Sequence, residues 1–282
     1  MHGDSAGNAK TQRRSGLRAA VPILFAGLLA AGCNRPEPPA GFSISVASDS
    51  SVALTWSAAP RTRPDKFVLR FRDVAQETAA VLAETSGQTY LHNPSGRTGV
   101  YSLAAVFGNT EYPALESCST IPVHSGPDMV AELNGSGNAG YGWERSGGAA
   151  YLSSMFDSTA AARADVYVSD FAAGHGQLPW YVASPGVAGL DPGGPVAGAG
   201  WRPTRLTNPL DSEQMPPPAQ SSRAYFEWTE LQADTTILAC FTTDSHYALV
   251  KVWGVDTTAG TLQLEAWYQS MPGLRLTAHR SR

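Results

Sequence analysis

Apolar and polar residues alternate along much of the chain, and this pattern predicts short β-strands. In residues 42–46 and 52–56 every second residue is apolar, which gives each stretch one apolar face. The same period of two recurs, with turn residues between the stretches, in residues 66–73, 164–171, 224–231, 235–243, 246–255 and 261–269, and residues 89–108 predict a short strand, a turn and a long strand. Glycine and proline, with 28 and 20 copies, supply the turns that many short strands require. The pattern therefore predicts an all-β protein.

The predicted strands fall into two groups, and we expect two β-sandwich domains in tandem. Residues 41–124 hold the first group, whose strand lengths and turns are typical of a single sandwich. The pattern changes near residues 123–128, and residues 127–282 hold the second group, for which we expect a jelly-roll-like sandwich. Within it, residues 183–222 are rich in proline and glycine and predict a long irregular surface loop, a candidate for contact with a partner.

The N-terminal residues have a different pattern, which predicts a cleaved export signal. Lysine and arginine are spread over residues 10–18, and residues 19–31 are apolar. As a helix this apolar run would reach about 20 Å, whereas a membrane core is about 30 Å thick. We therefore expect residues 1–32 to be a signal peptide and residues 33–40 to be an extended tether.

The last residues of this signal, Ala30-Ala31-Gly32-Cys33, resemble the lipobox of bacterial lipoproteins. The resemblance implies that Cys33 receives lipid and becomes the new N-terminus, which would anchor the chain to a membrane. Asn34 after the cysteine favours the outer membrane by the sorting rule of enteric bacteria. The alternative is an ordinary secretory signal with Cys33 as an incidental thiol. Residues 12–18 also resemble a loose twin-arginine signal, so the export route stays open.

The first group of strands resembles a fibronectin type III domain. Trp56 lies on the second strand, and Leu91 is followed by a Pro/Gly turn and by Tyr101-x-Leu103-x-Ala105, as in the family's tyrosine corner. The resemblance implies that Trp56 and Tyr101 are core residues and that the Tyr101 hydroxyl bonds back to the backbone. The family is mostly a spacer and interaction module, which implies no catalysis.

The second group is similar to the β-rich surface lipoproteins of the HmuY type. The similarity lies in short motifs: Tyr141, Trp143, residues 165–168, Tyr247-Ala248 and Tyr268-Gln269. It implies a carrier of a small ligand, since members of that family bind haem through paired histidines. The candidate ligands here are His175 and His246, with His279 as a third histidine, and surface positions for all three are the alternative.

The net charge, two cysteines and one glycine motif limit the functions that this chain could have. The net charge is −4 and becomes more negative without the basic leader, so the chain lacks the basic surface that binds nucleic acid. Cys118 and Cys240 are disulfide candidates in an oxidising compartment, although two buried free thiols are favoured. The glycines at positions 135, 137 and 140 spell GxGxxG, but no helical pattern follows, so we expect a turn.

No catalytic signature of zinc, thiol, nucleotide or hydrolase chemistry is recognised in the sequence. Glu227 and Glu230 flank Trp228, an arrangement that could suit a sugar site, although solvated charges on a strand are favoured. The sequence therefore favours a non-enzymatic, lipid-anchored module of the cell envelope, without a cofactor, that binds an envelope protein or a glycan. The alternatives are a ligand carrier, with haem as the named ligand, and a carbohydrate-active or carbohydrate-binding protein.

Overall fold

The computed structural model describes residues 35–59 and 62–277. The predicted leader, the predicted lipid-attachment residue Cys33 and His279 lie outside these residues. The described chain is nearly all β, with one four-residue α-helix, α1 (Ser158–Ala161), and one six-residue 3₁₀-helix, η1 (Pro185–Leu190). None of the helices in this part of the chain is long and apolar enough to cross a membrane. The predicted all-β fold is confirmed.

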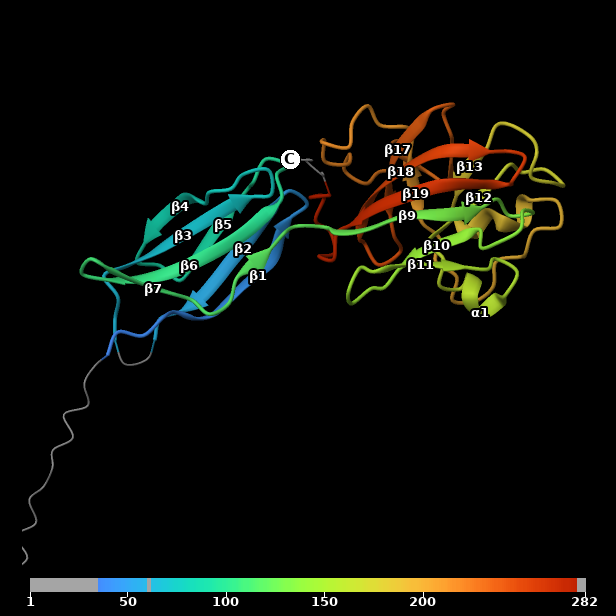
Figure 1. The fold of residues 1–282 in the computed structure, drawn as a ribbon. Helices are drawn as coiled ribbons and strands as arrows, with labels where there is room; N and C mark the ends of the chain where they lie inside the picture. Colours follow the sequence, from blue (N-terminus) through green and yellow to red (C-terminus); the bar gives the residue numbers. More distant parts are fainter. Residues whose placement is uncertain (1–34, 60–61, 278–282) are drawn as a thin grey trace, which may run out of the picture. The chain divides into compact units, whose positions relative to one another are not determined.

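The first sandwich, drawn from blue to green in Figure 1, is built from two antiparallel sheets. One sheet has the order β1-β2-β5 and the other the order β4-β3-β6-β7, with β8 paired to β6. The strands are β1 (Ala40–Ser48), β2 (Ser51–Ser57), β3 (Lys66–Asp73), β4 (Ala80–Thr85), β5 (Thr89–His92), β6 (Gly99–Phe107), β7 (Thr110–Pro113) and β8 (Cys118–Ser119).

The core of the first sandwich follows from the alternation along its strands. The inward residues of β2, which include Trp56, are at most 4% exposed, and the indole of Trp56 packs edge-on against Phe67 at 5.7 Å between ring centroids. Tyr101 is fully buried, so both predicted core aromatics are confirmed. The Tyr101 hydroxyl, however, bonds to the imidazole Nδ1 of His92 at 2.9 Å. The backbone contact expected for a tyrosine corner is therefore replaced by a side-chain contact.

The second sandwich, drawn from green to red in Figure 1, has sheets of five and six strands. The five-stranded order is β11-β10-β12-β13-β16, and the six-stranded order is β15-β14-β17-β18-β19-β9. The strands are β9 (Val123–Ala131), β10 (Gly140–Trp143), β11 (Ala150–Ser153), β12 (Val166–Ser169), β13 (Tyr181–Ala183), β14 (Arg205–Thr207), β15 (Tyr225–Phe226), β16 (Trp228–Glu230), β17 (Thr235–Phe241), β18 (Tyr247–Asp256) and β19 (Thr261–Tyr268). Gly135 and Gly137 of the GxGxxG motif lie in the turn between β9 and β10, as predicted, and Gly140 begins β10.

The predicted junction between the two domains lies inside one strand. The break expected near residues 124–127 falls within β9, which pairs with β19 from Val123 to Ala131. The change of pattern in residues 123–128 suggested a break, but β9 is an edge strand, where Pro127, which has no N–H group, is tolerated. A register shift lies opposite Gly126, whose φ of +91° and close approach to the Leu264 carbonyl oxygen require glycine.

The end of the described chain was assigned to the second sandwich but contributes to the first core. Leu274 and Leu276 are at most 1% exposed and belong to the same buried cluster as Trp56. Arg275 between them pairs with Asp49 at 2.8 Å. The segment follows the last strand and carries no strand pattern of its own, so its burial could not be predicted from alternation.

The two cysteines lie in different cores and do not form the alternative disulfide. Cys118 belongs to the cluster around Trp56, whereas Cys240 belongs to the cluster around Trp143. Both are free and buried. Burial raises the pKa of each thiol, which keeps them in the unreactive protonated form.

Candidate functional site

The stretch from Tyr225 to Glu230 connects the two sheets of the second sandwich. The alternation in this stretch predicted one strand, but the structure has two. Tyr225–Phe226 forms β15, at one edge of the six-stranded sheet, and Trp228–Glu230 forms β16, at one edge of the five-stranded sheet. Glu227 lies between them, and its carbonyl oxygen accepts a hydrogen bond from Ser184 N at 2.7 Å. The chain therefore passes directly from one sheet edge to the other.

The apolar face predicted for this stretch is the exposed one. Tyr225 and Thr229 are each 3% exposed, whereas Phe226 is 38% and Trp228 is 43% exposed. Tyr225 donates to the Pro218 carbonyl oxygen at 2.9 Å, and Thr229 donates to that of Thr207 at 2.5 Å. These hydrogen bonds hold the side chains of Tyr225 and Thr229 in the interior. The side chains of Phe226 and Trp228 therefore face solvent.

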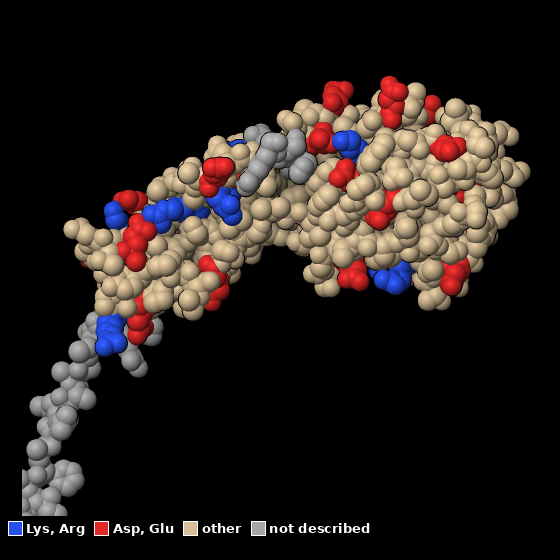
Figure 2. All heavy atoms as spheres, viewed as in Figure 1, with Lys and Arg blue, Asp and Glu red and all other residues tan. Residues whose placement is uncertain are grey.

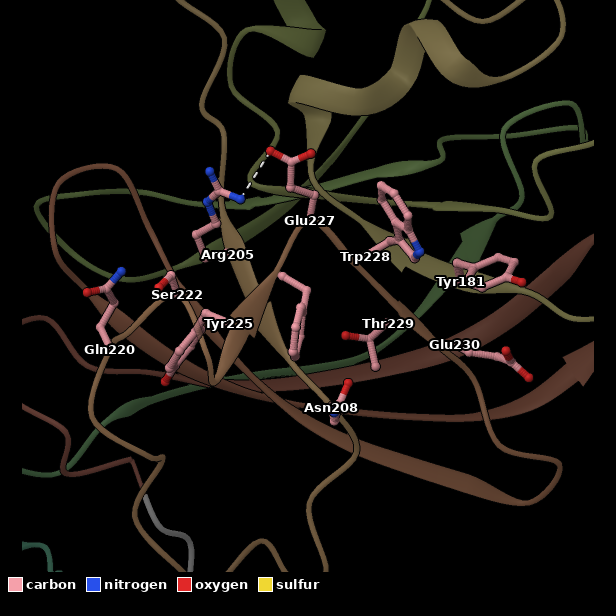
Figure 3. Close-up of a pocket in the computed structure, with 11 residues that line it drawn as sticks. Tyr181, Arg205, Asn208, Gln220, Ser222, Tyr225, Glu227, Trp228, Thr229 and Glu230 are labelled. Atoms are coloured by element: carbon pink, nitrogen blue, oxygen red, sulfur yellow. Dashed lines mark ion pairs between the residues drawn. The ribbon is translucent and has the colours of Figure 1, made fainter.

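These two sheet edges form the walls of an open cleft of about 760 Å³. Figure 3 shows the side chains that line it, with Arg205, Gln220 and Ser222 on the side opposite Tyr181 and Glu230. The lining combines exposed aromatic rings with amides, hydroxyls and charged groups. Its residues are Tyr181, Arg205, Asn208, Gln220, Ser222, Tyr225, Phe226, Glu227, Trp228, Thr229 and Glu230.

The predicted long loop supplies one wall of the cleft, but it is not structureless. Residues 183–222 include η1 and the short strand β14, which pairs with both β15 and β17. Leu206 in β14 is fully buried. A three-residue strand is too short to produce a recognisable period, which explains why it was missed. Farther along the loop, Gln220 N donates to the Tyr247 hydroxyl at 3.1 Å and fixes the rim of the cleft.

A strained phenylalanine supports the exposed tryptophan. Phe171 has a φ of +52°, a conformation that is costly for a bulky residue. Its ring packs against Tyr181 at 5.1 Å and edge-on against Trp228 at 5.9 Å between centroids. The Phe171 amide donates to Ser169 Oγ at 2.7 Å, which helps to hold this conformation. The local hydrogen bonds therefore position an aromatic cluster beside the cleft.

Buried carboxylates hold the loop that carries Phe171. Asp170 accepts from the amides of Ala172 at 2.9 Å and Gln177 at 3.2 Å, and Glu132 Oε1 accepts from the amide of Asp170 at 3.2 Å. Glu132 is fully buried, and burial raises its pKa to about 7 against the lowering effect of these amide hydrogen bonds. This carboxyl therefore titrates close to neutral pH.

The charged groups of the cleft partly cancel one another. Arg205 and Glu227 form an ion pair at 3.1 Å, shown as the dashed line in Figure 3, and Glu230 adds a further negative charge. The two carboxylates point in different directions in Figure 3, so they do not form a close pair. Over the wider surface, basic and acidic side chains are interspersed on the face shown in Figure 2.

The structure does not bring the two candidate histidines together. His246 immediately precedes β18, is 6% exposed, and donates from Nδ1 to the Gln269 carbonyl oxygen at 2.8 Å. The ring of His175 lies against Gly260, in the turn that follows β18. The ten residues of β18 span roughly 30 Å. Two histidines at opposite ends of this strand cannot ligate one iron, so this pair does not fit haem.

Residues 35–59 and 62–277 contain no group of three or more His, Cys, Asp or Glu that could hold a metal ion. The buried motif residues attributed to the HmuY similarity instead build the core. The rings of Trp143, Tyr268 and His246 form a stack, with Trp143 and Tyr268 centroids 5.6 Å apart and Tyr268 and His246 centroids 5.0 Å apart. The presence of Trp143 and Tyr268 in these motifs is therefore explained by their packing in the core.

Comparison with known proteins gives only partial likenesses. No protein-family model matches the chain, and no curated protein matches it. Among solved structures, a fibronectin type III domain of human collagen XX is 23% identical over 36% of this chain and 100% of its own, with a TM-score of 0.26. A fibronectin type III domain of human contactin 1 is 18% identical over 33% of this chain and 82% of its own, with a TM-score of 0.25. The expected similarity to HmuY-type lipoproteins gains no support from these comparisons.

Sequence reasoning found part of the cleft and missed the rest. It singled out Trp228 with its two flanking glutamates, although it favoured an ordinary strand surface for them. It missed Arg205, Asn208 and Gln220, which lie in the stretch of high proline and glycine content. The only local signal for them was the length of that loop, since long loops in compact domains are often functional.

Proposed function

We propose that this chain is a lipid-anchored, non-enzymatic module of the cell envelope that binds its ligand in the cleft beside Trp228. The observation that carries the binding role is the 43% exposure of Trp228 in a cleft of about 760 Å³ lined by hydrogen-bonding groups. Exposed aromatic residues surrounded by polar groups are typical of recognition sites. The anchoring role rests on the lipobox-like residues Ala30–Cys33.

The anchor is tested by replacing the thiol that would carry the lipid. We expect Cys33→Ser to release the chain from the membrane fraction of the native host, because two or three acyl chains would otherwise hold it there. Membrane fractionation and mass spectrometry of the N-terminal peptide give the two readouts. A wild-type peptide that still carries its leader, or that has an unmodified residue 33, would contradict the proposal.

The binding site is tested without assuming a class of ligand. The full chain in detergent is mixed with sedimented envelope fragments from its host, and the bound fraction is measured as protein concentration rises. We expect Trp228→Ala to weaken binding about tenfold, or about 1.4 kcal/mol. Phe156→Ala, which removes an aromatic ring that is 57% exposed elsewhere on the second sandwich, is the matched control. Equal weakening by both substitutions would show that the effect is not specific to the cleft.

A further inference from the structure

We infer that the ligand of the cleft is a neutral glycan, whose pyranose rings stack on Trp228 and Phe226 while amides and hydroxyls of the cleft bind the sugar hydroxyls. This inference rests on the binding role proposed above and names the class of ligand for the same site. Four features of the cleft support it: its aromatic rings, its free amides, its charge and its extent.

The aromatic rings suit the apolar faces of sugars. Pyranose rings with equatorial hydroxyls, such as glucose and N-acetylglucosamine, present a face of C–H bonds to which the negative face of an aromatic ring is attracted. Phe226 and Trp228 are both exposed in the same cleft, and each is next to a buried residue, Tyr225 before Phe226 and Thr229 after Trp228. Phe171 packs against Trp228 and limits its movement. A pre-positioned ring loses little conformational freedom when a ligand binds.

The polar groups suit hydroxyls rather than charges. Asn208 and Gln220 line the cleft, and neither side-chain amide has a hydrogen-bond partner among the residues that the structure describes. Each amide offers both donors and an acceptor, which match a hydroxyl group that is itself donor and acceptor. Figure 3 shows Asn208 and Gln220 on separate sides of the cleft, so that they could contact different sugar units.

The charge of the cleft disfavours acidic polymers. The only cation among its lining residues, Arg205, is already paired with Glu227, and Glu230 remains as a negative charge. A glycan that carries uronic acids or phosphates would meet net negative charge, whereas a neutral glycan carries no such penalty.

The hollow surface extends beyond one sugar unit. Glu227 also lines a second, shallower hollow of about 340 Å³, which includes Leu190 and Val196. These two side chains are 65% and 85% exposed and could pack against further sugar rings. The extent of this surface favours an oligosaccharide over a monosaccharide.

A peptide is the competing occupant, because both walls of the cleft are sheet edges. A peptide that adds a strand needs a row of unpaired backbone groups. Here β15 has two residues and β16 has three. Edges this short provide little template for a further strand, so the observations favour a glycan.

The experiment measures binding of defined oligosaccharides to the full chain in detergent by isothermal titration calorimetry. The probes are cellohexaose and chitohexaose as neutral chains, cellobiose as a short chain, and a hexamer of galacturonic acid as an acidic chain. We expect at least one neutral hexamer to bind more tightly than both cellobiose and the acidic hexamer. Trp228→Ala should weaken that binding at least tenfold, about 1.4 kcal/mol, and Trp228→Phe should retain part of it.

Two further variants keep the result interpretable. Asn208→Ala removes only a polar contact and should weaken binding by a smaller factor, while Phe156→Ala should bind like the wild type. The inference is overturned if neither neutral hexamer binds, if Trp228→Ala binds as tightly as the wild type, or if the acidic hexamer binds best.

The envelope fragments separate failure of this inference from failure of the proposed function. Periodate oxidation of the fragments cleaves glycans that carry vicinal diols, such as 1,4-linked glucose, and chitinase cleaves 1,4-linked N-acetylglucosamine, which has no such diol, whereas proteinase treatment removes proteins. Loss of Trp228-dependent binding after periodate or chitinase, but not after proteinase, supports the glycan. Loss after proteinase alone overturns the glycan in favour of a protein partner and leaves the binding role of the cleft intact. A wild-type chain that binds no untreated fragments contradicts the binding role itself.

Discussion

Asp165→Asn should lower the free energy of unfolding by about 3–5 kcal/mol, because it removes one partner of a buried ion pair. Asp165 is fully buried, and its carboxylate oxygens accept hydrogen bonds from Arg145 Nη2 at 2.5 Å and from Trp143 N at 2.9 Å. Arg202 contributes a second cation, 3.8 Å from the same carboxylate. Asparagine keeps the shape of the side chain but leaves Arg145 without its buried counter-charge.

The pKa values show that burial and pairing oppose each other at this site. Burial raises the pKa of Asp165, and Arg145 is the main influence that lowers it. For Arg145, burial is the largest single influence and favours the neutral form, but the charge and hydrogen bond of Asp165, together with Asp244 and Tyr268, raise the arginine pKa. We take the pair to be ionised, since two guanidinium groups and a backbone amide face this one carboxylate.

The matched control uses the other carboxylate of the same arginine. Asp244 pairs with Arg145 Nε at 2.7 Å, but its side chain is 40% exposed. Exposed pairs contribute little, so Asp244→Asn should cost at most about 1 kcal/mol. Chemical denaturation of the full chain in detergent, monitored by circular dichroism, measures both variants. Equal costs for the two variants would show that burial of Asp165 is not what makes its pair important.

Glu132 should make the second sandwich less stable as the pH rises from about 4.5 to about 7. Its pKa is raised from 4.5 to about 7 in the folded protein. Between these values the unfolded chain has lost the proton while the folded chain still binds it, so stability falls with rising pH. The contribution is fully present below pH 4.5 and is lost as the pH passes 7. The total change is on the order of 3 kcal/mol.

The test compares the wild type with Glu132→Gln across this pH range. Glutamine does not titrate, so the variant should lack this part of the pH dependence. The unfolding free energy of the wild type minus that of the variant should therefore fall as the pH rises. Other groups with raised pKa values, such as buried Asp191, are present in both proteins and cancel in the comparison. A difference between the two proteins that is constant from pH 4.5 to pH 7 would contradict the assignment. Because Glu132 supports the loop of Phe171, a tryptophan-fluorescence change over the same range would link its titration to the cleft.

The long strands could be predicted from the sequence because each buries one face. In β2 the local alternation reports directly on burial, whereas the first four residues of β18 are all buried, and the structure places both strands where the pattern does. The pattern was weaker in residues 123–128, which include Pro127 and where the predicted domain boundary lies within a continuous edge strand. Whether proline ends a strand depends on whether the missing N–H group faces a partner, and the local sequence does not contain that information.

The alternation at Phe226 and Trp228 predicts the period of this stretch but does not establish which of its two faces is buried. An alternating strand has two faces, and hydrophobicity alone assigns the more apolar one to the core. Here Tyr225 and Thr229 are buried instead, because the hydroxyl of each has a carbonyl acceptor within the sandwich. Those acceptors, Pro218 and Thr207, come from a segment for which no regular structure was expected.

By itself the sequence determined that the chain is all β and which stretches form its long strands. These properties follow from a period of two that is repeated within each strand, so neighbouring residues suffice to specify them. Only the tertiary structure decided that two short strands and a proline-rich loop enclose a cleft, and that His175 and His246 lie at opposite ends of one strand. It also decided that Asp165 meets Arg145 and Arg202 in the interior. These features depend on contacts between residues far apart in the chain, which no local pattern specifies.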